Sequence, residues 1–186
     1  MKWKGFVLCL AVSAVAQVPY DRIRRADSEP GNWLTYSGNY SAHRYSKLSQ
    51  ITPANVKGLK PAWVYQIKAR DKVEATPLVV DGIMYLTEPA GEVTALDTRT
   101  GRTLWNYRRP MPKGVRGCCG QVNRGAAILD DTVFVGTFDA HLVALDAKSG
   151  LVRWDTPVAD YNLGHSITVA PLAVKDKIVV GIAGGE

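Results

Sequence analysis

Two adjacent cysteines carry the clearest chemical potential in this sequence. Cys118 and Cys119 stand between Gly117 and Gly120. A disulfide between neighbouring cysteines closes a small, strained ring, and flanking glycines suit such strain because they adopt backbone conformations that other residues avoid. An oxidising compartment would let the two thiols pair. The sequence therefore favours a disulfide between them, and two free structural thiols are the alternative.

Three polar residues elsewhere stand out by their positions, and one of them has a type that suits binding of an acidic group. Arg124 follows Cys119 by five residues, and its planar guanidinium suits bidentate recognition of a carboxylate. Glu74 stands just before one apolar run, and Thr168 just before another. The plainer alternatives are a surface arginine, a solvated loop acid and a hydroxyl of the kind common at strand starts.

The last four residues form a small-residue loop that ends in a carboxylate. They are Ala183, Gly184, Gly185 and Glu186. The small residues would let the backbone approach a bound group closely, and carboxylate oxygens suit a hard cation. Histidines offer no such site, because their spacing is not that of metal ligands. These histidines are His43, His141 and His165.

The elements that would position these residues belong to a repeat. Residues 93–105 and 142–154 share the pattern Ala-Leu-Asp-x-x-x-Gly-x-x-x-Trp at an offset of 49 residues. Upstream positions keep the same offset, and a third copy begins at Ala170. We place the repeats near residues 75–110, 124–158 and 168–186. Repeated residues build a scaffold, so residues that interrupt the repeat are where function is expected.

Each copy predicts four short strands. In the first copy these strands cover residues 77–80, 83–86, 93–96 and 103–107, with Asp and Gly at the intervening turns. Four strands in about 49 residues is typical of a propeller blade. The fold class is therefore all-β, a propeller of four-stranded antiparallel blades. We interpret Trp105 and Trp154 as packing residues between blades, and Asp97 and Asp146 as turn formers.

The number of blades is lower than a closed propeller needs. Trp63, within residues 61–67, resembles the last strand of a blade whose other strands are absent. The chain then carries one terminal strand, two blades and the start of a third, whereas propellers need about four to eight blades. We therefore expect a fragment of a longer chain; the alternative is a short protein that closes by oligomerising.

The amino terminus has the features of a secretory signal peptide. Residues 1–16 contain Lys2 and Lys4, a short apolar run and an Ala-x-Ala cleavage pattern. The run is too short to span a bilayer, so we expect a periplasmic protein with no transmembrane span; an uncleaved anchor is the alternative. We expect residues 17–31 to be mobile. Removing both lysines lowers the formal charge from +6 to +4, and no basic run interleaved with aromatics indicates nucleic-acid binding.

Several motifs together resemble one enzyme family. They are residues 33–40 (WLTYSGNY), 44–46 (RYS) and 51–59 (ITPANVKGL), the paired blade motifs, and the Gly-Cys-Cys-Gly segment. In this combination, over residues 32–186, the chain resembles the pyrroloquinoline quinone (PQQ) dependent methanol and ethanol dehydrogenases. The resemblance implies an eight-bladed propeller with PQQ near its axis, beside a calcium or lanthanide ion.

The resemblance also implies a reaction. Such enzymes oxidise a primary alcohol to an aldehyde and pass electrons to a cytochrome c or a quinone. Their catalytic Asp, a further metal-ligand Asn and the Trp covering the other face of PQQ would fall beyond residue 186. We therefore expect the chain alone to be inactive.

Site roles follow from the same resemblance. The Cys118–Cys119 ring would pack on one face of PQQ, Arg124 would bind its acidic groups, and Glu74 and Thr168 would contact it. Glu186 would ligate the metal. The loop Ala183, Gly184 and Gly185 would approach the cofactor, although the family usually has Ser where Ala183 stands.

A cofactor-free propeller that scaffolds outer-membrane assembly is the competing function, because such proteins share the blade motif. A scaffold has no need of adjacent cysteines, an arginine five residues later, or a glutamate ahead of the first blade strand. The enzyme is therefore the favoured interpretation.

Overall fold

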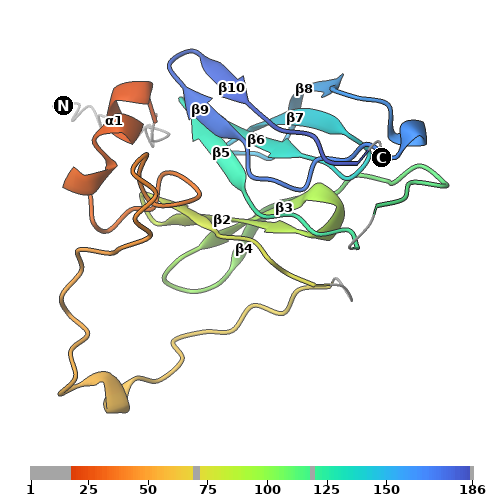
Figure 1. Cartoon of the computed structure of the whole chain (residues 1–186). Helices are drawn as coiled ribbons and strands as arrows, with labels where there is room; N and C mark the ends of the chain where they lie inside the picture. The colour runs from red at the N-terminus through yellow and green to blue at the C-terminus, as the bar shows by residue number, and fades with distance from the viewer. Residues whose placement is uncertain (1–17, 69–71, 118–119, 185–186) are drawn as a thin grey trace, which may run out of the picture.

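The computed structural model describes residues 18–68, 72–117 and 120–184. Within them, two four-stranded antiparallel sheets and one two-stranded sheet follow one another along the chain (Figure 1). The first sheet comprises β1 (Leu78–Val80), β2 (Ile83–Glu88), β3 (Glu92–Asp97) and β4 (Thr103–Tyr107). The second comprises β5 (Ala126–Leu129), β6 (Thr132–Gly136), β7 (His141–Asp146) and β8 (Val152–Pro157). The third comprises β9 (Leu172–Val174) and β10 (Lys177–Val179). The predicted four-stranded blades are confirmed.

The helices in the described ranges are short. They are α1 (Tyr20–Arg24), η1 (Ala26–Ser28), η2 (Val56–Gly58), η3 (Pro89–Gly91) and η4 (Tyr161–Leu163). None of them is both long enough and apolar enough to cross a membrane.

Turn residues repeat with the blades. Asp81 and Asp130, one in each four-stranded sheet, both have positive φ, +48° and +52°, at the hairpin that joins the first two strands. Asp tolerates this conformation better than most residues, which explains its repetition there. Asp97 Oδ1 accepts backbone N–H bonds from Arg99 and Thr100, and Asp146 repeats the pattern with its own turn. Both aspartates are therefore turn formers.

Tryptophans pack between neighbouring blades. The indole of Trp105 lies on Gly150, where a Cβ would come within 2.5 Å of the ring, and its Nε1 donates to the Ala147 carbonyl at 3.0 Å. Trp63 makes equivalent contacts with Gly101 and the Thr98 carbonyl, which lie 49 residues before Gly150 and Ala147. No strand is assigned to residues 61–67, but Trp63 occupies the repeat position that the sequence predicted for it.

Residues 18–34 pack against both four-stranded sheets. Val18, Ile23 and Leu34 are buried in the main core cluster together with side chains of β1, β3, β5, β6 and β7. The backbone of Val18 pairs with that of Asp130, and Arg22 bonds the carboxylates of Glu29 and Asp81. In the described part of 17–31, apolar side chains and Arg22 therefore find partners far along the chain, and the mobility expected of this segment stays a prediction.

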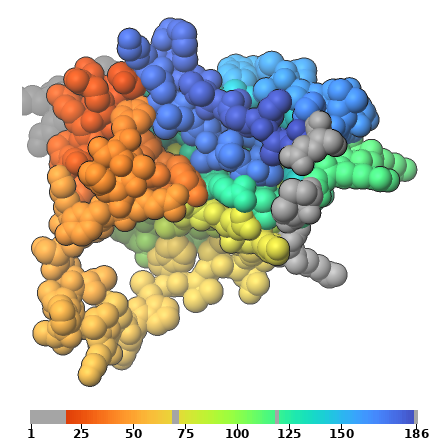
Figure 2. Space-filling view, viewed as in Figure 1, coloured from red at the N-terminus to blue at the C-terminus, as the bar shows by residue number. Residues whose placement is uncertain are grey.

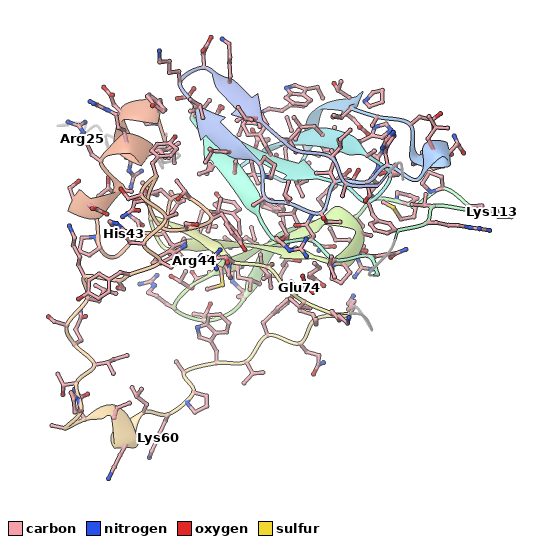
Figure 3. The ribbon with its side chains drawn as sticks, viewed as in Figure 1. Arg25, His43, Arg44, Lys60, Glu74 and Lys113 are labelled. Carbon is pink, nitrogen blue, oxygen red and sulfur yellow. The ribbon has the colours of Figure 1, made fainter. Side chains whose placement is uncertain are left out.

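The segment that follows is extended. Residues 41–64 leave the body and return to it, with η2 near the far end and Lys60 beside it (Figures 1 and 3). Its atoms stand apart from the sheets in the space-filling view (Figure 2). Several of its apolar side chains are exposed, namely Tyr45, Leu48, Ile51, Val56, Leu59 and Val64.

Candidate functional site

The starts of three successive sheets are joined by backbone hydrogen bonds. The N–H of Thr76, just before β1, donates to the carbonyl of Arg124 at 3.1 Å. The N–H of Arg124, just before β5, donates to the carbonyl of Thr168, ahead of β9, at 3.1 Å. Because the first strand of each propeller blade faces the axis, these three residues lie along the axial edge of adjoining blades.

Three residues predicted for the site converge at this edge. Arg124 Nη2 lies 3.0 Å from Glu74 Oε2, and Arg124 Nη1 donates to Thr168 Oγ1 at 3.0 Å. Glu74 is labelled in Figure 3, on the segment that leads into the first sheet. The structure therefore brings together Glu74, Arg124 and Thr168, which come from three separate repeats.

The ion pair in this cluster is partly exposed to solvent. The side chains of both Arg124 and Glu74 are 38% exposed. An ion pair with that much solvent access contributes little to stability. The ion pair is therefore weak and accessible to solvent, while Thr168 bonds the other end of the guanidinium.

The small-residue loop lies beside the same region. Ala183 and Ser166 exchange two backbone hydrogen bonds, each 2.8 Å long. Gly184 has a φ of +86°, and a Cβ on it would collide with the carbonyl oxygen of Gly164. Only glycine fits there, so Ala183 and Gly184 are held against the segment that leads to Thr168. Cys118, Cys119, Gly185 and Glu186 lie outside the described residues.

The ends of the cysteine segment are packed against the blades. The ring of Phe138 covers Gly117, and the carbonyl of Gln121 accepts from Ala90 N–H at 2.7 Å. Phe138 belongs to the β6–β7 turn and Ala90 to η3, the equivalent turn of the first sheet. Turns of two neighbouring blades therefore hold the chain on either side of the pair.

An ionic cluster around the buried Asp139, next to Phe138, was missed by sequence reasoning. Arg109 Nε donates to both oxygens of Asp139, at 2.9 and 2.8 Å, and the Arg109 guanidinium also bonds Asp155. His141 Nδ1 lies 2.6 Å from Asp155 Oδ1. Burial acts to raise the pKa of Asp155, but the bonds from Arg109 and His141 outweigh it and lower that pKa. The cluster ties the chain just after β4 to the second blade. Local sequence patterns could not reveal it, because Arg109 and Asp139 are 30 residues apart.

A second feature that the sequence did not reveal is His165. Its Nδ1 is buried without a hydrogen-bond partner in the described part of the chain, and it directly precedes Ser166 of the loop contact.

The described residues hold no cluster of metal ligands. Residues 18–68, 72–117 and 120–184 contain no group of three or more His, Cys, Asp or Glu able to hold an ion.

Known proteins share this architecture. The model of the PQQ family described as "Glucose/ethanol/alcohol dehydrogenase, beta-propeller domain" matches residues 33–184. The quinohemoprotein alcohol dehydrogenase ADH-IIG of Pseudomonas putida is 44% identical over 95% of this chain and 25% of its own length. Its solved structure superposes with a TM-score of 0.82 at 43% identity, over 91% of this chain and 26% of that one.

Two further relatives have printed names that bear on chemistry. A 1-butanol dehydrogenase (cytochrome c) of Thauera butanivorans is 45% identical over 84% of this chain and 23% of its own length. A europium-containing methanol dehydrogenase superposes with a TM-score of 0.83 at 38% identity, covering 89% of this chain and 30% of that one. The chain thus spans about a quarter of the length of the curated relatives it matches.

A more distant likeness concerns the fold alone. BamB from Moraxella catarrhalis superposes with a TM-score of 0.52 at 24% identity, over 65% of this chain and 33% of that one. At that identity the likeness shows a shared fold and carries no argument about function.

Proposed function

The chain belongs to the PQQ-dependent glucose/ethanol/alcohol dehydrogenase β-propeller family, and we propose that it contributes the first blades and part of the cofactor site of an alcohol dehydrogenase. The observation that carries this proposal is the convergence of Glu74, Arg124 and Thr168 at the axial edge of three blades. A partly exposed arginine beside a hydroxyl fits the carboxylates of PQQ.

Each residue of this cluster has a part in the proposed binding. Arg124 receives an acidic group of the cofactor in its planar fork, and Thr168 Oγ1 adds a neutral hydrogen bond. Glu74 orients Arg124 through their ion pair and itself contacts the cofactor. When bound, PQQ would supply a quinone as the two-electron acceptor for oxidation of an alcohol to an aldehyde, and a base elsewhere in the protein would take the hydroxyl proton.

Residues outside the described ranges complete the proposal. The Cys118–Cys119 pair, as a vicinal disulfide, covers one face of PQQ. Gly185 and Glu186 continue the loop that Ala183 and Gly184 begin beside Ser166. The carboxylate of Glu186 ligates calcium or a lanthanide, and the europium-containing relative supports the second of these ions.

The whole protein's reaction and location are part of the same proposal. It oxidises small primary alcohols in the periplasm, after removal of residues 1–16, and passes electrons to a cytochrome c or a quinone. The printed name of the Thauera relative supports a cytochrome acceptor. The chain by itself is inactive, because the catalytic Asp and the remaining metal ligands of this family come from other parts of the protein.

A chimaera tests the proposal. Residues 33–184 of this chain replace the matching part of ADH-IIG, and alcohol oxidation is measured with PQQ and calcium. We expect activity that Arg124→Met reduces by about tenfold or more, because a charged hydrogen bond of about 1.5 to 3 kcal/mol is lost. Arg153→Met is the matched control, since Arg153 is also ion-paired and 35% exposed but pairs with turn residues of the second blade, Asp131 and Asp146. A folded chimaera that is inactive, or equally affected by both variants, would contradict the proposal.

A further inference from the structure

The residue before Arg124 has a buried side chain whose two polar ends are both used. Asn123 is 3% exposed. Its Nδ2 donates to the carbonyl of Gly136 at 2.8 Å, and its Oδ1 accepts from the N–H of Gly125 at 3.0 Å. The amide therefore ties the residue after Arg124 to the end of β6.

Both points that Asn123 joins are themselves closely packed. A Cβ on Gly136 would collide with Ile167, and a Cβ on Gly125 would lie 3.2 Å from the carbonyl oxygen of Thr76. Gly125 also has a φ of +148°, which L side chains rarely adopt. The Asn123 amide thus holds a backbone bend that sits tightly between the neighbouring blades.

We infer that Asn123 is a positioning residue, which aims the guanidinium of Arg124 along the axial edge without itself touching a bound cofactor. The backbone of Arg124 bonds Thr76 on one side and Thr168 on the other. Asn123 adds a third attachment, its bond to Gly136 within the same blade. The positioning itself follows from the contacts of Asn123. Its purpose, recognition of the acidic groups of PQQ, rests on the proposed function.

Only asparagine satisfies both partners. Asp would still accept from Gly125 N–H, but its second oxygen would face the Gly136 carbonyl, and two acceptors repel. Ala would leave a buried N–H and a buried carbonyl unpaired, and each such group costs about 1 to 3 kcal/mol. Asn123→Asp therefore removes only the bond to Gly136, whereas Asn123→Ala removes both bonds.

Amide hydrogen exchange on the full chain, measured by NMR, tests the positioning without any cofactor. We expect Asn123→Ala to lower the protection of the Gly125 and Arg124 amides by about tenfold, as loss of a buried hydrogen bond implies. Asn123→Asp should keep protection at Gly125 and lose it at Arg124. Asn106→Ala is the control, because Asn106 Nδ2 also bonds within a single blade, to Thr94 Oγ1, but the residue is exposed and far from Arg124 in sequence.

Two outcomes of the amide hydrogen-exchange experiment would contradict the inference. Unchanged protection of Arg124 in both Asn123 variants would overturn the inference. So would global loss of protection in both variants while Asn106→Ala stays folded, because Asn123 would then be a general structural residue.

A second measurement asks whether the positioning serves acid recognition. PQQ and its trimethyl ester are titrated into the full chain and followed by NMR shifts, which report weak binding. We expect Asn123→Asp to weaken PQQ by about fivefold, less than the loss of a whole charged bond, and to leave the ester unchanged. In an Arg124→Met background the Asn123 effect should vanish.

The two hypotheses fail in different ways. Equal weakening of PQQ and its ester, or an Asn123 effect that persists without Arg124, would overturn the positioning role. Absence of any PQQ-induced shift at Arg124 in the unaltered chain would count against the proposed function, while the exchange experiment would still decide the role of Asn123.

Discussion

Arg124 Nη1 lies 3.0 Å from Thr168 Oγ1 although 44 residues separate the two in sequence. A similar separation divides Glu74 from Arg124, which are also 3.0 Å apart. Both separations are close to the length of the blade repeat. Successive blades therefore deliver side chains from equivalent strand starts to one place, and the cluster is a direct product of the repeat.

The adjacent cysteines should be oxidised in the exported protein. Their neighbours Gly117 and Gly120 allow the strained ring, and secretion supplies the oxidant. Intact-mass analysis after alkylation, with and without prior reduction, measures the state of Cys118 and Cys119. We expect two added alkyl groups only after reduction. Two alkyl groups in the unreduced sample would show free thiols instead.

Arg109 should be more important for stability than its neighbour Arg108. Asp139 is 2% exposed and bonded to Arg109, so Arg109→Met leaves a buried carboxylate without its cation. Removing one partner of a buried pair costs about 3 to 5 kcal/mol. Arg108→Met is the control, since Arg108 pairs with Glu92 at the surface. Urea unfolding followed by circular dichroism compares them, and equal losses would contradict a buried role for Arg109.

Acid should weaken the second blade over a defined range. Hydrogen bonds from Arg153 and Ser149 lower the pKa of Asp146 to about 2. In the unfolded chain this carboxyl returns toward its ordinary pKa of about 3.9. A depressed folded pKa means that the stabilisation is complete above the unfolded value and is lost as pH falls toward about 2.

The variant Arg153→Gln isolates this effect. It should raise the pKa of Asp146 and of Asp131, whose pKa Arg153 also lowers, and flatten the stability decline between about pH 4 and 2. Carboxyl titration by NMR measures both groups, with Arg116→Gln as a control on an exposed loop. An Asp146 pKa that does not move would show that Arg153 is not its main partner.

The isolated chain should self-associate. All six residues of β8 are exposed, and Trp154 is 42% exposed, whereas its repeat equivalent Trp105 is packed on Gly150. Exposed strand edges and apolar surface promote association. Sedimentation velocity over a range of concentrations should show association that Trp154→Ser reduces. A monomer at every concentration, with one sharp unfolding transition, would refute this expectation.

Local patterns were sufficient to predict the blades. Asp97, Gly101 and Trp105 recur 49 residues later, because each has a turn-forming or packing role that every blade needs. Trp63 could be placed for the same reason, although no strand is assigned around it. Repetition thus encodes the fold in the residue types themselves.

Long-range pairs were beyond the reach of the sequence. Arg22 bonds Asp81 across 59 residues, a contact that no local pattern of the sequence indicates. The bond from Arg109 to Asp139 likewise joins residues 30 positions apart in sequence. Among site residues, Glu74, Arg124 and Thr168 were named through a family resemblance, and their mutual distances became available only from the fold.

The most direct test of the cofactor site separates PQQ binding from metal binding in the ADH-IIG chimaera, extended here through residue 186. Equilibrium dialysis measures PQQ and calcium bound by the unaltered protein, Arg124→Lys and Glu186→Gln. Lys keeps the charge of Arg124 but loses its planar fork, so PQQ affinity should fall by about tenfold while calcium is retained. Glu186→Gln should reduce calcium affinity more than PQQ affinity. Unchanged PQQ affinity in Arg124→Lys, together with unchanged calcium affinity in Glu186→Gln, would contradict the assignment of this edge of the propeller as the cofactor site.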